Sequence, residues 1–564
     1  MEGITMAATD RFDAIVIGSG ISGGFAAKEL TEKGMRVLML DRGRMVEHAE
    51  GYPYDGKPAY EVPARNIMPR PLIDSDYFIA THGYVAPSNR TFYNDDRLNP
   101  YAYDEGSKFY WIRPGAVGGK SLIWGRWTFR WAPEDFTANK RDGIDGEWPI
   151  GYDDVAPWYS YVENYIGVSG SHENLPYLPD SEFQPPMPMN VAEKWLKQRL
   201  ETQFPGRKLI NTRLSNMTED KPDQNRTKCQ FRNQCSNGCS FGAYFSTQAV
   251  TLPAARATGR LTLRSDAVVT NLDYDADGKR VTGVRFVDAK TGLAETVRAD
   301  LVFLCASAMA STQILMNSRD AASGRSHFDT SNTLGRYVMD HIFRVGISGE
   351  IPGMQDLIEY GRRPGGVYIP RFRNIGGSER DLGFKRGYGY QGSAFRDPMG
   401  PVGFGAKMKH DMRRYGPWKF GMGAFGECLP YADNRVSLHP TKVDRFGVPL
   451  MRFDVTFREN ELRMMADART QGEAMLRGAG LTNVTSNAGE HVPGDAIHEM
   501  GGARMGRDPR ISVLNAWSQA HAASNLYVTD GAQMASVACV NPSLTFMALT
   551  ARAVDHAVKQ ARKA

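Results

Sequence analysis

The N-terminal segment contains a strand, a glycine-rich turn, a helix and a second strand that ends in an acid, and this unit limits the fold more than any other feature. Residues 12–17, FDAIVI, are predicted to form a buried strand, and the turn GSGISG follows at residues 18–23. A helix is expected up to about Lys33, and the second strand, RVLMLD, ends at Asp41. This order is typical of a dinucleotide-binding α/β domain with a doubly wound sheet.

Each chemical requirement of such a unit has a candidate residue here. Gly18 permits the tight turn, Gly20 lets a pyrophosphate approach the backbone, and Gly23 allows the helix to pack on the strand. The amino end of the helix would face the phosphates. Asp41 would accept hydrogen bonds from the ribose hydroxyls. A glycine turn alone is a common pattern, but the surrounding strands, helix and acid together predict a nucleotide site.

The composition restricts the class of protein. With 564 residues the chain is too long for one ordinary core, and about two domains are expected. Hydrophobic residues make up 41% and charged residues 23%, which argues against wholesale disorder and against a membrane-embedded body. The net charge of +5 is spread without a basic block, so we expect no nucleic-acid partner.

Targeting signals are not expected. Residues 1–10 have neither a basic stretch nor an apolar core, so the chain should carry no secretory signal of its own. No window approaches the roughly 20 continuous apolar residues that a membrane span requires. A membrane or periplasmic location would then need a partner.

The rest of the chain has coarser patterns. Residues 44–110 are expected to be mainly loops, and the glycine-rich stretch at 113–121 precedes an aromatic run and could equally be a surface turn. Between 261 and 305, strands alternate with hairpin turns and end in a helix. Residues 341–457 hold short alternating runs that predict a large antiparallel sheet. Helices are expected at 459–480 and 545–564.

Three motifs near the C-terminus carry a family resemblance. They are HEMGGARMG from His498, NLYVTDG from Asn525 and NPSLT from Asn541. With FDAIVIGSGISG, RPGAVGGKSLIWG and LGRYVMDH upstream, they follow the order of the glucose-methanol-choline (GMC) flavin oxidoreductases, which the chain resembles over nearly its whole length. The resemblance implies an α/β, doubly wound, Rossmann-like domain that binds FAD, and a second, α+β substrate domain built on a large antiparallel sheet.

The resemblance also implies discontinuous domains. The FAD-binding domain is expected to comprise residues 1–50, 105–135, 240–340 and 490–564. The substrate domain, with a cysteine-bearing excursion, is expected to comprise 51–104, 136–239 and 341–489.

The cofactor site that the resemblance implies is spread over these segments. Asp41 stands where Glu is more usual in the family, and its shorter side chain keeps the acceptor role. The residues expected to bind FAD are Gly18, Gly20, Gly23, Asp41, Arg42, Gly118, Gly119, Ser121, Val269, Asp530, Gly531 and Asn541.

Alcohol oxidation requires a base that takes the hydroxyl proton while the hydride leaves the carbon, and histidine suits that role at neutral pH. Most histidines are structural, but His498 lies in a family motif and is our candidate base. Asn541 is the candidate partner that positions the substrate oxygen. The pair resembles the His/Asn version of the pyranose-oxidising branch. Glu499 and Arg504 are expected to brace the loop or to tune the histidine.

Cys229, Cys235 and Cys239 have the spacing C-x5-C-x3-C in a polar segment. They could be incidental buried cysteines, but such residues usually sit in apolar surroundings. Zinc normally takes four protein ligands in a structural site, and paired CxxC knuckles are absent. An iron-sulfur cluster with three cysteine ligands explains the count better. The spacing resembles that of bacterial FAD-dependent glucose dehydrogenase and glucoside 3-dehydrogenase catalytic subunits, which implies a [3Fe-4S] cluster.

The resemblance implies a sugar dehydrogenase. We expect oxidation of a pyranose or glucoside hydroxyl at carbon 3, hydride transfer to N5 of FAD, and electron exit through the cluster to a c-type cytochrome. A small helper subunit with a twin-arginine signal would take the folded pair to the periplasm; otherwise the protein would be cytoplasmic. The alternatives are a glucose 1-dehydrogenase, a gluconate-type 2-dehydrogenase, an oxygen-using pyranose oxidase, and an NAD(P)H-dependent or purely electron-transferring flavoprotein.

Overall fold

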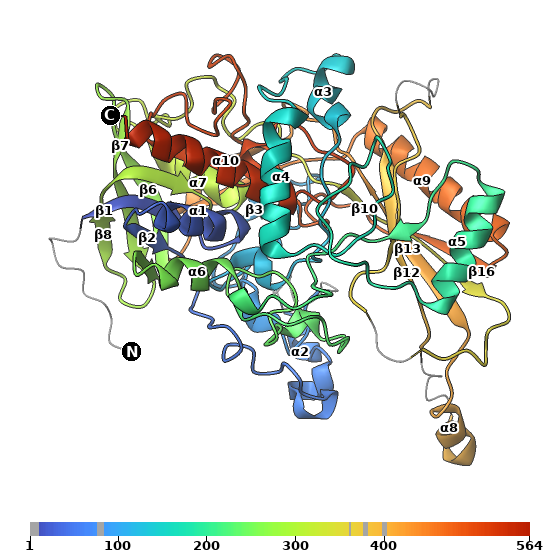
Figure 1. Cartoon of the computed structure of the whole chain (residues 1–564). Helices are drawn as coiled ribbons and strands as arrows, with labels where there is room; N and C mark the ends of the chain where they lie inside the picture. The colour runs from blue at the N-terminus through green and yellow to red at the C-terminus, as the bar shows by residue number, and fades with distance from the viewer. Residues whose placement is uncertain (1–10, 76–83, 360–362, 376–381, 398–402, 564) are drawn as a thin grey trace.

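Two units lie side by side in the computed structural model, which describes residues 11–75, 84–359, 363–375, 382–397 and 403–563 (Figure 1). One unit contains a parallel sheet and helices, and the other an antiparallel sheet and helices. The predicted combination of a doubly wound domain and a large antiparallel sheet is therefore confirmed. Among the helices of the described segments, none has both the length and the apolar character needed to cross a bilayer.

The parallel sheet has the order β17-β9-β1-β2-β5. Ile15 in the central strand lies opposite Leu38 on one side and Val302 on the other, and all three side chains are buried. The strands are β1 (Phe12–Ile17), β2 (Val37–Leu40), β5 (Leu261–Arg264), β9 (Ala299–Leu304) and β17 (Leu526–Val528). The sheet therefore joins strands from distant parts of the sequence around the N-terminal unit.

Helices α1 (Ile21–Glu32) and α10 (Ser543–Ala561) pack against each other beside this sheet, and α4 (Tyr152–Ile166) packs on α10. A second, three-stranded antiparallel sheet consists of β6 (Ala267–Asp275), β7 (Arg280–Asp288) and β8 (Ala294–Val297). Helix α7 (Ala308–Asn317) follows β9 and packs on β6. The predicted hairpins between 261 and 305 and the strand that runs into a helix are confirmed.

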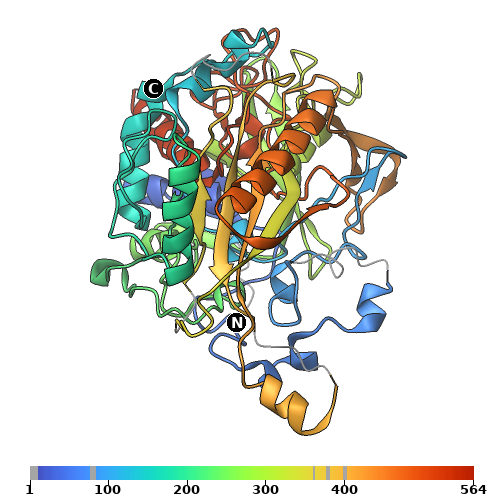
Figure 2. The ribbon, with the colours of Figure 1, turned by 90° about the vertical axis from the view of Figure 1, so that its right-hand side faces the viewer.

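The antiparallel sheet has the order β16-β10-β13-β12-β11-β4. Helix α9 (Glu459–Gly478) crosses its outer face (Figure 2), and α5 (Val191–Gln203) lies beside α9. Met464 and Met475 of α9 share a core with Ile347 and Met422 of the sheet. The strands are β4 (Ile210–Asn211), β10 (Ile342–Ile351), β11 (Val367–Ile369), β12 (Tyr388–Phe395), β13 (Trp418–Gly426) and β16 (Thr482–Ala488).

The extent of this sheet differs from the prediction. Strands β14 (Arg435–Val443) and β15 (Pro449–Asp454) form a separate sheet with β3 (Ala102–Tyr103) and pack on α7. Phe453 of β15 stacks on Phe109, with ring centroids 4.2 Å apart. Aromatic packing therefore holds this hairpin against the segment that carries Phe109. Alternation of polar and apolar residues predicts a strand but not the sheet that it joins.

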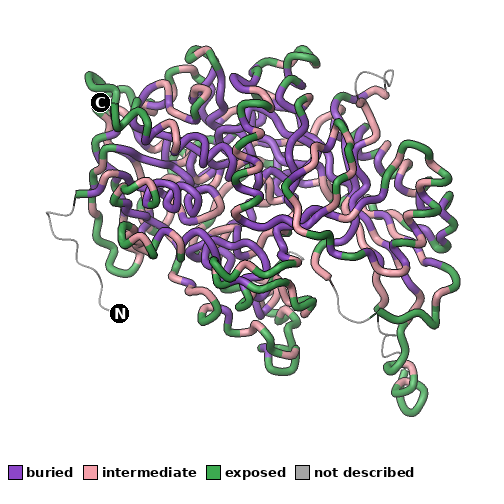
Figure 3. Tube along the Cα trace, viewed as in Figure 1, coloured by how far each residue is buried: buried purple, intermediate pink, exposed green. Residues whose placement is uncertain are grey.

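Buried backbone runs through both units, and the exposed segments lie at the periphery (Figure 3). The remaining α-helices of the described segments are short: α2 (Arg70–Ile73), α3 (Pro133–Arg141), α6 (Thr251–Ala257) and α8 (Gly405–Asp411). Helix α10 was expected at 545–564 and α9 at 459–480, and both predictions are confirmed within a few residues. The exact domain boundaries given above stay a prediction.

Candidate active site

A cavity of about 690 Å³ extends from the amino end of α1 to His498 and Asn541. Strands and loops of the parallel unit form much of its wall, and Gln391 of β12 and Phe425 of β13 contribute from the antiparallel sheet. Its volume lies in the range of ordinary cofactor and substrate sites. Of the predicted site residues, the wall includes Gly18, Gly20, Asp41, Arg42, Gly119, Val269, His498, Asp530, Gly531 and Asn541.

The amino end of α1 has the shape that a phosphate group needs. No side chain caps the helix at Gly20, and a Cβ placed there would point into open space. Gly18 has a φ of +96°, and a Cβ at this position would lie 2.5 Å from the carbonyl oxygen of Cys305. Gly23 lies behind the wall, where its Cα packs on the Gly18 carbonyl. Uncapped N–H groups that border a cavity can bind a pyrophosphate, so this end fits FAD.

Asp41 is buried at the end of β2 and organises the turn around the nucleotide site. Its Oδ2 accepts hydrogen bonds from the backbone N–H and the hydroxyl of Ser19, and its Oδ1 accepts one from the Gly43 N–H at 2.7 Å. Burial raises the pKa of this carboxyl despite these hydrogen bonds. Arg42 beside it donates to Asn99, and burial lowers the pKa of its guanidinium.

The second glycine-rich stretch, residues 113–121, is in contact with the first, residues 18–23. The Gly118 N–H donates to the Ser19 hydroxyl at 2.7 Å, and the hydroxyl of Ser121 donates back to the Gly118 carbonyl at 2.6 Å. Gly119 lines the cavity, whereas Gly118 and Ser121 lie behind it. A Cβ at Gly119 would lie 3.0 Å from the Cα of Gly20, so the two stretches are in contact.

Three more predicted cofactor residues border the cavity from other elements. Val269 comes from β6, and Asp530 and Gly531 follow β17. The Asp530 carboxylate accepts hydrogen bonds from the Ala532 N–H and the Ser311 hydroxyl. Burial raises its pKa to about 6. Their roles toward FAD stay predictions, but their positions along one wall agree with a single extended ligand.

His498 and Asn541 come together although 43 positions separate them in the sequence. The Nε2 of His498 lies 3.4 Å from the Nδ2 of Asn541, and both residues line the cavity. The Oδ1 of Asn541 accepts a hydrogen bond of 2.6 Å from the Nε2 of Gln391. This contact fixes the amide so that its N–H side faces the histidine.

A second histidine sets the tautomer of His498. His341 is fully buried, and its Nε2 lies 2.7 Å from the carbonyl oxygen of Ala538, so this nitrogen must donate. The Nδ1 of the neutral His341 ring is then an acceptor, and it lies 3.1 Å from the Nδ1 of His498. His498 must donate from Nδ1, which leaves its Nε2 unprotonated. This nitrogen can take a proton from a group in the cavity.

The electrostatic surroundings keep both rings neutral. Burial lowers the pKa of His341 to about 4. Burial, the neighbouring His341 and the Lys120 ammonium together hold the pKa of His498 well below its usual value. An imidazole that is neutral at physiological pH is in the protonation state that a general base needs.

The residue before His341 positions the backbone of the same loop. Asp340 is buried, and its carboxyl oxygens accept hydrogen bonds from the N–H groups of Gly494, Ala496 and His498, at 2.8 to 3.2 Å. Burial and the nearby Glu499 raise its pKa to about 7. Asp340 and His341 therefore hold the backbone and the ring of His498, respectively.

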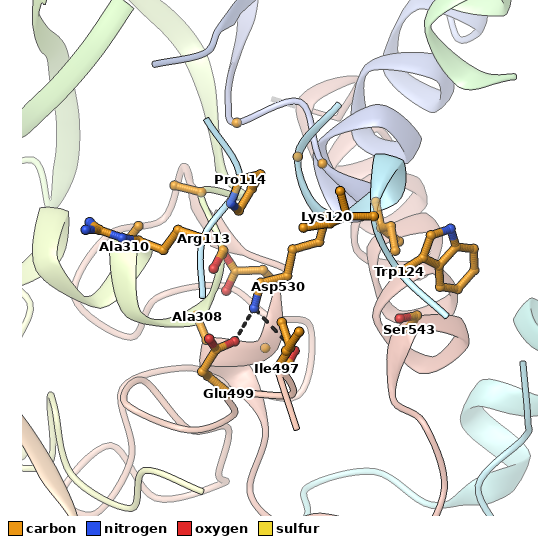
Figure 4. A pocket seen from close by; sticks show the side chains of 18 of the residues that line it. Arg113, Pro114, Lys120, Trp124, Ala308, Ala310, Ile497, Glu499, Asp530 and Ser543 are labelled. Atoms are coloured by element: carbon orange, nitrogen blue, oxygen red, sulfur yellow. Dashed lines mark hydrogen bonds and ion pairs between the residues drawn. The ribbon is translucent and has the colours of Figure 1, made fainter. Parts of the chain in front are cut away.

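Lys120 and Glu499 form an ion pair in the wall near His498 (Figure 4). The Lys120 ammonium also donates to the carbonyl oxygen of Ile497 at 3.3 Å. The other oxygen of Glu499, Oε1, is buried without a hydrogen-bond partner among the described residues. Glu499 therefore anchors a cation beside the base, whereas Arg504 binds Asp145 and the Ile511 carbonyl, away from the cavity wall.

Residues 229–239, the cysteine loop, border the large cavity at Ser236 and reach the protein surface at Phe231. Cys229, Cys235 and Cys239 together line a small separate cavity of about 20 Å³, and Ser236 of the same loop lines the large one. Burial and the other two cysteines raise the pKa of the Cys229 thiol to about 11. The other cysteines, Cys305, Cys428 and Cys539, are buried.

The metal prediction has no direct support from side-chain geometry. Within the described part of the chain, no group of three or more His, Cys, Asp or Glu residues is arranged to hold a metal ion. The three thiols share one cavity and a donor chemistry that suits iron. Their role as cluster ligands stays a prediction.

Comparison with known proteins identifies the family. Two family models described as GMC oxidoreductase match the chain, one over residues 12–342 and the other over residues 430–550. The chain belongs to the GMC oxidoreductase family. It is an FAD-dependent oxidoreductase that acts on alcohol groups.

Relatives with assigned activities extend over the same length. The chain is 27% identical to the fructose dehydrogenase large subunit of Gluconobacter japonicus, over 96% of this chain and 97% of that protein. It is 28% identical to 6'''-hydroxyparomomycin C oxidase of Streptomyces lividus, over 97% and 91%. The crystal structure of pyridoxine 4-oxidase from Mesorbium loti has the same fold, with a TM-score of 0.57 and 15% identity over 98% and 99% of the two chains.

Several residues of this site escaped the sequence analysis. His341 and Asp340 were part of the family motif LGRYVMDH, but nothing in its sequence indicated that they support His498. Gln391 comes from the middle of a strand in the other unit. Lys120 was part of a glycine-rich stretch, where a charged residue among small ones was the available signal.

Proposed function

We propose that this protein is a dehydrogenase that oxidises a ring hydroxyl of a pyranose or glucoside, at carbon 3, to a ketone. The observation that carries the proposal is the unprotonated Nε2 of His498 next to the amide N–H of Asn541 in the cavity wall. A hydroxyl oxygen placed between them would donate its proton to His498 and accept a hydrogen bond from Asn541.

The chain's own residues would handle the proton. His498 takes it at Nε2, and its Nδ1–H remains bonded to His341 throughout. Asn541 keeps the oxygen in place because Gln391 holds its carbonyl side. When bound, FAD supplies the acceptor for the hydride that leaves the carbinol carbon. The products are a ketone, a protonated histidine and a reduced cofactor, so protons and electrons balance.

The choice of carbon 3 rests on the long aromatic and Pro-rich segment at 51–110. This segment differs from the pattern of the glucose dehydrogenases that the chain resembles, and Val85, Ala86, Asn89 and Tyr93 from it line the cavity. It would therefore decide how a sugar is turned toward His498. Glucose 1-dehydrogenase and gluconate-type 2-dehydrogenase chemistry remain the alternatives, and an oxygen-using pyranose oxidase is the third.

For the exit of electrons we propose a [3Fe-4S] cluster held by Cys229, Cys235 and Cys239. The position of the cysteine loop supports this, because Ser236 borders the large cavity while Phe231 and Phe241 of the same region are exposed at the surface. A c-type cytochrome would be the acceptor. A helper subunit with a twin-arginine signal would bring the complex to the periplasm.

The test of the activity is anaerobic reduction of the flavin in the purified holoenzyme. Methyl glucoside, whose anomeric carbon is blocked, should bleach the flavin, and NMR should show a 3-keto product. A response to free glucose alone would favour carbon 1, and a 2-keto product would favour carbon 2. Stoichiometric hydrogen peroxide in air would identify an oxidase, and bleaching by NADPH but by no sugar would contradict the proposal.

The cluster has a separate test. The protein, purified with its helper subunit, should contain about three irons per chain and give the electron paramagnetic resonance signal of an oxidised [3Fe-4S] centre. A yellow sample that contains no iron would overturn the cluster and favour the oxidase.

A further inference from the structure

Arg126 differs from Arg113 and Lys120, two other cations in the cavity wall; a further one, Arg42, donates to Asn99 and lies near the Asp41 carboxylate. Arg113 pairs with Asp96 at 3.5 Å, and Lys120 pairs with Glu499. Arg126 also lines the cavity, but it forms no ion pair with any acid in the described part of the chain. Its Nη1 donates to the carbonyl oxygen of Trp124, while its Nε is buried without a partner. A guanidinium has five donor hydrogens, so most of its binding capacity is unused.

The backbone at this position is unfavourable for an arginine. Arg126 has a φ of +65°, in the left-handed region that glycine adopts without cost. Strained positions of this kind concentrate at functional sites. The arginine follows Gly125 in the cavity wall, so the chain places a large cation at a position where glycine would relieve the strain.

The aromatic ring of Tyr244 holds the guanidinium group in place. The centre of the guanidinium lies 4.7 Å from the centroid of that ring. Tyr244 is fully buried and donates to the Leu122 carbonyl, so the platform is fixed. A guanidinium held on its flat face keeps its edge available, and that edge matches the two oxygens of a carboxylate or a phosphate.

We propose that Arg126 binds an anionic group of the sugar, a carboxylate or a phosphate, and that the enzyme prefers an acidic sugar over its neutral counterpart. The inference rests on the proposed function, because it concerns the substrate of the same cavity. A half-buried cation without an acid partner favours an anionic ligand over a neutral one, since the ligand supplies the missing charge.

The test compares methyl glucoside with its 6-carboxylate and its 6-phosphate in the holoenzyme. The wild type should show a kcat/KM about 10- to 100-fold higher for at least one of the acids, mainly through a lower KM. The sugar that shows the gain identifies the anion as a carboxylate or as a phosphate. The perturbation of the flavin spectrum by a non-oxidisable carboxylate or phosphate gives a dissociation constant without turnover.

Two substitutions separate recognition from folding. Arg126→Gly should abolish the preference and keep the same or a higher melting temperature, because glycine accepts the positive φ. Arg126→Lys keeps the charge but not the planar fork, and should retain part of the preference. Arg298→Gln, which changes an exposed arginine, is the matched control and should leave the preference intact.

The outcomes are distinct for the two proposals. Equal kcat/KM values for the neutral and acidic sugars in the wild type would overturn the role of Arg126 and leave the sugar dehydrogenase in place. Loss of FAD from Arg126→Gly would show that the arginine binds the cofactor and would also overturn this inference. If no sugar of either kind reduces the flavin, the proposed function itself fails.

Discussion

The Nδ1 atoms of His498 and His341 lie 3.1 Å apart, and one proton between them fixes the tautomers of both rings. The proton belongs to His498, because the other nitrogen of His341 already donates to the Ala538 carbonyl. The basic nitrogen of His498 therefore points to Asn541 before any substrate arrives. Pre-set tautomers of this kind remove a reorganisation step from proton transfer.

His341→Leu should lower kcat by about 100-fold or more with little change in KM, because His498 loses the acceptor that fixes its tautomer. His341→Asn should recover much of the rate, since its amide can donate to the Ala538 carbonyl and accept from His498. Steady-state kinetics on both variants check this expectation. Equal kcat values for His341→Leu and His341→Asn would show that the imidazole of His341 contributes packing and no hydrogen bond to His498.

The pH dependence of kcat/KM should reflect the lowered pKa of His498. A base works only when it is unprotonated, so activity should fall as the pH drops through this pKa, below pH 6.5. Lys120→Met removes a neighbouring positive charge that lowers the pKa. In this variant kcat/KM should therefore begin to fall at a higher pH than in the wild type. An unshifted pH profile would mean that another group titrates.

The same burial predicts a pH effect on stability. The folded pKa of His341 is about 4, whereas the unfolded value is about 6.5, so the unfolded state binds the proton more readily. The contribution of the neutral His341 ring to the free energy of unfolding is complete above pH 6.5 and is lost as the pH falls toward 4. Between pH 6.5 and pH 4, the free energy of unfolding should therefore fall by about 3 kcal/mol less in His341→Asn than in the wild type. Denaturant unfolding at both pH values measures the difference.

Cys235→Ser should leave reduction of the flavin by sugar intact but should lower the iron content and impair electron delivery to a cytochrome. A dye that takes electrons directly from the flavin should restore turnover. Cys428→Ala, at a buried position outside the cysteine loop, is the control and should keep the iron. Loss of both half-reactions in Cys235→Ser would indicate a role of this loop in folding.

Local patterns predicted much of this structure. The run FDAIVI, the glycine turn and Asp41 were predictable because a parallel strand, a helix start and a strand end each depend on neighbouring residues. Resemblance to a family pointed to His498 and Asn541. The supports of His498 were not predictable, because Asp340 and His341 reach it across more than 150 positions. The bond from Gln391 to Asn541 also depends on how the antiparallel sheet packs on the other unit.

Asp55 connects the cysteine loop to a part of the chain that is made much earlier. One of its carboxylate oxygens pairs with Arg232 at 2.8 Å, and the other accepts a hydrogen bond from the Ser240 N–H at 2.9 Å. These contacts span 177 and 185 positions, so the loop has its final shape only after the early excursion has docked. During synthesis the cysteines would therefore emerge before this clamp closes around them. The shape of the loop around the three thiols therefore depends on Asp55 as much as on the loop's own sequence.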